Sequence, residues 1–136
     1  MRKFLTILMV IFCLLGIVAC KPQSQQVHGS QLLANGNVTK IDITSRPEEY
    51  NYTFTGEKSK EIIDYLSGLN LQSNFQENPD TYAGMTWVIS LEYENGDTLT
   101  IYHFGNTFIR SEKSSWYKMT YKEASRFDSL LNKLNN

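Results

Sequence analysis

Residues 85–119 read MTWVISLEYENGDTLTIYHFGNTFIRSEKSSWYKM, and their hydrophobic pattern determines the architecture of this chain. Apolar residues occupy every second position over residues 85–93, and a second alternating run follows Asn95 and Gly96. Alternation with a period of two is typical of half-buried β-strands, and Asn-Gly is a strong hairpin signal. Two further polar turns divide the remainder of the stretch. The stretch therefore predicts four consecutive antiparallel strands.

The loop length of the first hairpin determines which residues face each other. A two-residue loop would place Leu91 opposite Thr100. A three-residue loop over residues 94–96, with a left-handed glycine in a bulge, places Leu91 opposite Leu99 instead. The second register pairs apolar with apolar residues, so we favour it.

The preceding residues supply two further strands and one helix. Residues 38–45 and 50–55 alternate between apolar and polar, which predicts two extended segments. Apolar residues recur at spacings of three and four over residues 57–67, which predicts an amphipathic helix. Residues 70–82 show no period, and we expect a long loop there.

The C-terminal residues predict a second helix over 121–134. Thr120 and Glu123 have the spacing of a capping box, in which each residue satisfies a backbone amide of the other. We therefore expect one α+β domain over residues 38–136. It should contain a mainly antiparallel sheet of about five or six strands, including the four-strand C-terminal meander, with two helices packed on one face.

The N-terminal region has the form of a bacterial lipoprotein signal. Residues 1–19 begin with two cations, continue as an apolar core and end in Ala19, directly before Cys20. Residues 17–20, IVAC, resemble the bacterial lipobox, so we predict cleavage between Ala19 and Cys20 and lipidation of the Cys20 thiol. An uncleaved membrane-spanning helix is the alternative. It would need about 20 apolar residues, more than this run supplies before Lys21.

A diacylated cysteine would anchor the chain to a lipid bilayer, because two acyl chains hold stably where one does not. Residues 20–37 are polar and contain Pro, Gly and Ser, which predicts a flexible tether. Such a tether gives a separation of roughly 20 to 25 Å. If Leu32 and Leu33 dock on the domain, the tether ends sooner.

The predicted location of the protein is the extracytoplasmic face of the cell membrane. Leaders of this kind direct proteins to the outer surface of a Gram-positive cell or to the periplasm of a Gram-negative one. Lys21 follows the cysteine. In a Gram-negative cell the absence of Asp at this position would point to the outer membrane, and the sequence leaves both cell types open.

The charge and the cysteine content of the chain argue against nucleic acid as a partner and against a disulfide bond. Removal of residues 1–19 takes away Arg2 and Lys3 and no acidic residue, which changes the formal net charge from −1 to −3. No basic patch favours nucleic acid. Cys13 lies in the leader and Cys20 carries the predicted lipid, so no disulfide is expected.

No catalytic or cofactor motif stands out. His103 is the only histidine inside the predicted domain, and it lies opposite Trp87 in the favoured register. A metal site needs three or four converging ligands, and no other His or Cys is near, so we predict no metal and no cofactor. We expect a packed histidine whose ring bonds a neighbour, in a protein that is not an enzyme.

Aromatic residues are the remaining signal, at 12% of the chain. We expect Tyr82, Trp116 and Tyr117, with Arg110 on an adjacent strand, to form a binding surface. Half-buried tyrosines on an antiparallel sheet are the commoner explanation for such residues.

Two stretches carry a resemblance to a known family. VISLEYENGDTLTIYHFGNTFIR and SSWYKMTYKEASRFDSLLNKL, together with the lipobox and the polar tether, resemble small uncharacterised lipoproteins of Bacillus and related Gram-positive bacteria. The resemblance covers about residues 38–134 and implies a Gram-positive cell surface. It implies no active residues.

Three functional hypotheses follow. The first is a membrane-tethered binding module that presents a sheet face or the 70–82 loop to an envelope protein or polymer. The second is a hydrolase of envelope material that acts through His103 and a nearby carboxylate. The third is an inhibitor that shields the cell from an external lytic enzyme.

Overall fold

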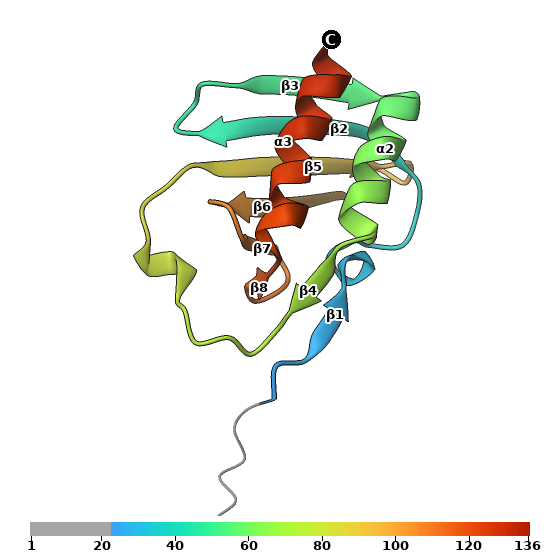
Figure 1. Cartoon of the computed structure of the whole chain (residues 1–136). Coiled ribbons are helices and arrows are strands. Elements are labelled where there is room, and N and C mark those ends of the chain that lie inside the picture. The colour runs from blue at the N-terminus through green and yellow to red at the C-terminus, as the bar shows by residue number, and fades with distance from the viewer. Residues whose placement is uncertain (1–22) are drawn as a thin grey trace, which may run out of the picture.

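The computed structural model describes residues 23–136, which form one antiparallel sheet of eight strands with both α-helices on one of its faces (Figure 1). The α+β class predicted from the sequence is confirmed. In chain order the elements are β1 (Gln26–His28), η1 (Gly29–Leu32), β2 (Val38–Arg46), β3 (Asn51–Thr55), α2 (Gly56–Ser67), β4 (Asn70–Gln72), η2 (Pro79–Thr81), β5 (Thr86–Tyr93), β6 (Thr98–Phe104), β7 (Phe108–Ser111), β8 (Tyr117–Lys118) and α3 (Tyr121–Asn135), where η denotes a 3-10 helix.

The strands lie in the order β1-β4-β8-β7-β6-β5-β2-β3. The four-strand C-terminal meander is therefore confirmed. The number of strands is larger than the five or six expected, because β1 and β4 add to the sheet beyond β8. Each has only three residues, which is too short for a period of two to be recognised.

The favoured hairpin register is confirmed. Leu91 faces Leu99, and Trp87 faces His103. Gly96 has a φ of 88°, in the left-handed region, and its amide donates to the Tyr93 carbonyl at 2.9 Å. A glycine adopts this conformation without the steric cost that a side chain would bring.

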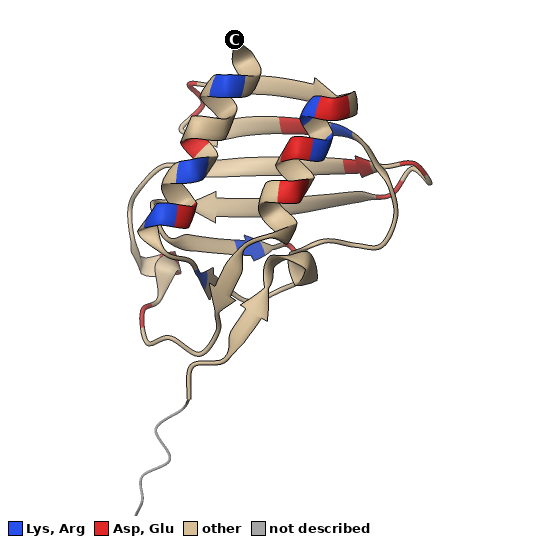
Figure 2. Cartoon of the chain, turned by 45° about the vertical axis from the view of Figure 1, so that its right-hand side comes forward, with Lys and Arg blue, Asp and Glu red and all other residues tan. Residues whose placement is uncertain are grey.

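The hydrophobic core lies between the sheet and the two helices. Phe127 of α3 is fully buried at its centre. Its ring centroid lies 5.0 Å from that of His103, 5.4 Å from Tyr65 and 6.1 Å from Trp87. The helix layer thus packs on the sheet around this aromatic side chain, together with further buried residues of both helices, among them Ile62, Leu66 and Leu131. Figure 2 shows acidic and basic residues interspersed along both helices.

The start of α3 is the capping box that the sequence predicts. The Thr120 hydroxyl accepts from the Glu123 amide at 3.2 Å, and the Glu123 carboxylate accepts from the Thr120 amide at 3.1 Å. The same carboxylate accepts from the Asn70 amide at 2.9 Å. Glu123 therefore joins the start of α3 to β4.

The expectation of a tether over residues 20–37 is wrong from Gln26 onward. Val27 of β1 faces Leu71 of β4, so the segment is the edge of the sheet. The Gly29 amide donates to the Leu69 carbonyl at 2.8 Å, and Leu32 is 1% exposed. The domain begins about twelve residues earlier than the predicted boundary at residue 38.

Residues 70–82 are also more ordered than the expected long loop. Asn70–Gln72 forms β4, which lies between β1 and β8, and Pro79–Thr81 forms η2. The Asn78 side chain accepts from the Asp80 amide at 3.2 Å and caps η2. Asn-Pro-Asp is typical of a turn, and here it forms one turn of 3-10 helix.

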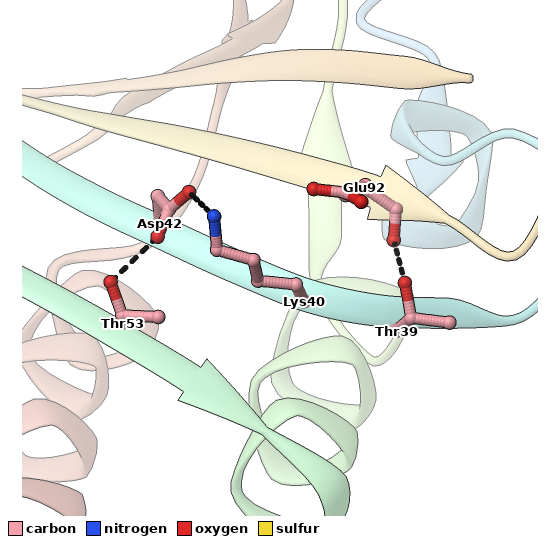
Figure 3. A network of polar contacts seen from close by, with 5 residues as sticks. All are labelled: Thr39, Lys40, Asp42, Thr53 and Glu92. Atoms are coloured by element: carbon pink, nitrogen blue, oxygen red, sulfur yellow. Dashed lines mark hydrogen bonds and ion pairs between the residues drawn. The ribbon is translucent and has the colours of Figure 1, made fainter. Parts of the chain in front are cut away.

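The sheet face away from the helices is polar around β2. Lys40 forms an ion pair with Asp42 at 2.7 Å, and the Thr53 hydroxyl donates to Asp42 at 2.6 Å (Figure 3). Partial burial raises the pKa of Asp42, but the hydrogen bonds from Lys40 and Thr53 and the Lys40 charge outweigh it, so the pKa lies below 3.8. Asp42 thus has one partner within β2 and one across the strand pair, on β3.

A buried serine closes the turn between β2 and β3. The Ser45 hydroxyl donates to the Pro47 carbonyl at 2.8 Å and accepts from the amides of Glu49 and Tyr50 at 2.9 and 3.0 Å. Ser45 itself is fully buried. Its small side chain thus sets the path of the chain into Tyr50.

We expect a Ser45→Ala variant to lower the free energy of unfolding by about 1 to 3 kcal/mol, because the substitution leaves two turn amides and a carbonyl without their partner. Urea denaturation measures the change. Thr44→Ala, at the neighbouring position on the other face of β2, is the matched control and should change stability by less than about 1 kcal/mol. Equal stability of Ser45→Ala and wild type would show that the hydroxyl does not hold this turn.

Candidate functional site

Three of the four residues predicted to form a binding surface line one depression on the sheet face away from the helices. They are Tyr82, Arg110 and Trp116. The depression has a volume of about 260 Å³. We call it the arginine–aromatic depression, and its other lining residues are Arg46, Pro79, Asp80, Thr86, Tyr102 and Phe104.

The central feature is the Arg110 guanidinium, which lies between two aromatic rings. Its carbon is 5.1 Å from the Tyr102 ring centroid and 4.9 Å from the Trp116 ring centroid. Tyr102 and Arg110 are directly opposed on β6 and β7, so the strand register positions this pair. A guanidinium over an aromatic face is stabilised by the ring quadrupole, and two rings hold the side chain in place.

The segment around η2 forms the rim. The Trp116 indole Nε1 donates to an Asp80 carboxylate oxygen at 2.9 Å, which ties η2 to the residue before β8. Tyr82 follows η2, is 50% exposed, and has its ring centroid 6.0 Å from that of Phe108. The rim therefore combines one fixed indole with one accessible tyrosine.

The charge of the depression is positive. Arg46 and Arg110 both line it, and neither takes part in an ion pair among residues 23–136. Asp80 is the one acidic lining residue, and it already accepts from Trp116. Within the described residues, the Arg110 Nε is also buried without a hydrogen-bond partner. Two guanidiniums with no carboxylate partner are suited to bind a phosphate or carboxylate group.

Tyr117 does not belong to this surface. It follows Trp116 directly, and side chains alternate along an extended segment, so it points to the opposite face. There it is half-buried and packs against the core. The predicted binding surface did not include Arg46, Asp80 or Tyr102. Of these, only Tyr102 had a usable signal, because the meander register places it opposite Arg110.

His103 is packed in the core, as expected, but its ring does not bond a neighbour. Neither ring nitrogen has a hydrogen-bond partner among the described residues, and the ring stacks on Phe127. Burial lowers the pKa of His103 to about 4. No carboxylate lies within hydrogen-bonding distance, so this part of the chain presents no acid–base pair of the kind that the hydrolase hypothesis requires.

Residues 23–136 contain no group of three or more His, Cys, Asp and Glu side chains that could hold a metal ion. In the same residues no helix is both long and apolar enough to cross a bilayer. The predicted signal peptide, the cleavage site at Ala19 and the lipidated Cys20 lie outside the described residues.

Comparison of the chain with protein-family models, with curated proteins and with solved structures gives no match. The resemblance to small Gram-positive lipoproteins therefore remains an expectation from the sequence. The class that the fold and the site define is a small α+β domain with a cationic, aromatic-lined depression on its sheet.

Proposed function

We propose that this protein is a lipid-anchored binding module on the extracytoplasmic face of the cell membrane, and that it binds an anionic polymer of the cell envelope. The anchor is a diacylglycerol on Cys20, which becomes the first residue after cleavage behind Ala19. The polymer docks at the arginine–aromatic depression.

One observation carries the proposed binding role: Arg110 is held between Tyr102 and Trp116 and has no ion-pair partner among the described residues. A cation held in a fixed position recognises an anionic group at a low entropic cost. The chain as a whole is slightly acidic, so long-range attraction does not draw polyanions to it. Recognition must then be local, through Arg110 and Arg46.

The size of the depression favours a polymer over a folded protein. A stable protein–protein interface buries about 800 Å² on each partner. A depression of about 260 Å³ instead accommodates one repeating unit of a chain. The exposed Tyr82 ring at the rim adds apolar area next to the charged groups.

Replacing Arg110 by glutamine is expected to weaken binding to isolated cell envelopes at least about tenfold, because a hydrogen bond to a charged group contributes about 1.5 to 3 kcal/mol. Arg46→Gln should show a smaller loss. Co-sedimentation of the full chain with purified envelopes measures both. Raising the salt concentration should weaken wild-type binding as well.

Lys113→Gln is the matched control, since Lys113 is exposed in the turn after β7 and does not line the depression. Envelopes stripped of phosphodiester polymers, or with their carboxylates amidated, show which anion is recognised. Unchanged binding after both treatments, or equal binding by Arg110→Gln and Lys113→Gln, would refute the assignment. Retention of the protein by an envelope protein alone would also refute it.

The anchor has its own test. Mass spectrometry of the protein purified from its native membrane should show a mature chain beginning at a diacylated Cys20. A Cys20→Ala variant should keep its leader or lose its membrane association. An unmodified thiol at Cys20 would remove the anchor but leave the binding site open to the envelope experiment.

A further inference from the structure

A second depression lies on the helix-covered face of the sheet, between the β2–β3 turn, the start of β5 and the end of α3. Its volume is about 250 Å³. We call it the tyrosine depression. It shares no lining residue with the arginine–aromatic depression, so a function assigned to one does not depend on the other.

Its sheet side is a row of aromatic rings. The Tyr50 and Tyr52 rings are nearly parallel, with planes 11° apart and centroids separated by 6.3 Å. Phe54 continues the row at 6.0 Å from Tyr52 and is buried. Trp87 packs against both tyrosines from the side, at 5.7 and 6.3 Å. The row thus begins in the core and ends at Tyr50, which is 47% exposed.

Tyr50 is held in place before any ligand arrives. The Ser45 hydroxyl accepts from the Tyr50 amide, and the Ser45 amide donates to the Tyr50 carbonyl at 3.1 Å. The Trp87 indole supports the ring itself. A large side chain held in this way binds a partner without a further ordering cost.

The helix side of the depression consists of Leu131 and two polar side chains that have no partner among the described residues. Asp128 and Asn132 lie four residues apart on α3, and therefore on the same helix face. Both are exposed, and neither side chain makes a hydrogen bond or ion pair with another described residue. Together they offer a carboxylate acceptor and an amide that both donates and accepts.

We propose that the tyrosine depression binds a sugar ring of an uncharged glycan. The C–H groups on one face of a pyranose carry partial positive charge and pack on the negative face of an aromatic ring, here Tyr50. The sugar hydroxyls then bond with Asp128 and Asn132. No Lys or Arg lines the depression, and the Asp128 carboxylate repels acidic sugars, so the occupant is neutral.

A small organic cation is the alternative occupant, since aromatic rings beside a carboxylate also attract ammonium groups. Recognition of such a cation uses rings that surround it. Here the two tyrosine rings are nearly parallel and Trp87 is buried beside them, which forms a wall and leaves the cation open on its other sides. A flat ring fits this arrangement better.

The test is binding of chitohexaose, cellohexaose and maltohexaose to the full chain in a detergent without a sugar head group, measured by saturation-transfer NMR and calorimetry. At least one of them should bind the wild type. Tyr50→Ala should weaken that binding about tenfold or more, as loss of an aromatic anchor does. Asn132→Ala should weaken it severalfold while leaving the aromatic row intact.

Tyr121→Ala is the matched control, because Tyr121 is 67% exposed and lines neither depression. It should bind like the wild type, and so should Arg110→Gln, which impairs only the proposed anionic site. Absence of binding by all three oligosaccharides at about 10 mM would overturn the inference. Equal binding by Tyr50→Ala and Tyr121→Ala would overturn it, as would Tyr50-dependent binding of tetramethylammonium in place of the sugars.

Discussion

A Gly29→Ala variant is expected to lose about 3 kcal/mol or more of its free energy of unfolding, measured by urea denaturation with tryptophan fluorescence. A Cβ atom at this position would lie 1.9 Å from the Leu66 backbone oxygen and 2.9 Å from the Leu69 Cβ. Neither neighbour can rotate away, because one is backbone at the end of α2 and the other is joined directly to it. The segment η1, which begins at Gly29, or the helix α2 must therefore shift.

Ser30→Ala is the control for this variant, since Ser30 is the next residue and is exposed. It should leave stability within about 0.5 kcal/mol of the wild type. Leu32→Ala offers an independent measurement, with an expected loss of about 2 to 5 kcal/mol for a buried leucine. If residues 26–32 were only a tether, all three variants would match the wild type.

The second large effect is a loss of stability in mild acid that depends on His103. Burial lowers the pKa of His103 to about 4 in the folded protein, against 6.5 for an ordinary histidine. As the pH falls below 6.5, the His103 side chain therefore binds a proton in the unfolded chain. In the folded protein the same side chain stays neutral until about pH 4. The free energy of unfolding should fall across this window by on the order of 3 kcal/mol.

A His103→Leu variant should be nearly as stable as the wild type at pH 7, because the ring nitrogens have no hydrogen bonds to lose. It should also lose most of the pH dependence between 6.5 and 4. His28→Gln is the matched control, since His28 is exposed, and it should keep the wild-type profile. A profile in His103→Leu that is as steep as in the wild type would assign the acid sensitivity to other groups.

The parts of the fold that the sequence predicts are those in which a pattern repeats for long enough. The strand β5 has apolar residues at every second position, with Val88 as the one further apolar residue, and α3 combines a capping box with four turns of apolar spacing. Pairing apolar with apolar residues then determined the register, and the register placed His103 opposite Trp87. Each of these features is encoded by neighbours in the chain.

The parts that were missed depend on distant contacts. The strand β1 has three residues and exists because Leu71 and Leu69 lie beside it, about 40 residues later. Similarly, Arg46 and Asp80 lie near Arg110 only because β2 belongs to the same sheet as β7 and because η2 lies beside Trp116. A local hydrophobic period cannot show which distant residues come into contact. The candidate site was therefore predicted in part, and the N-terminal boundary of the domain was not predicted.

The order of the strands also places β1 and β3 at opposite edges of the sheet. For a chain anchored at Cys20, the six residue steps to Gln26 reach at most about 20 Å. The strand β1 lies at one edge of the sheet and β3 at the other, seven inter-strand steps away, or up to roughly 34 Å (Figure 1). In a chain anchored at Cys20, the β1 edge would therefore lie within about 20 Å of the bilayer, with Tyr50 at the opposite edge of the sheet, next to β3.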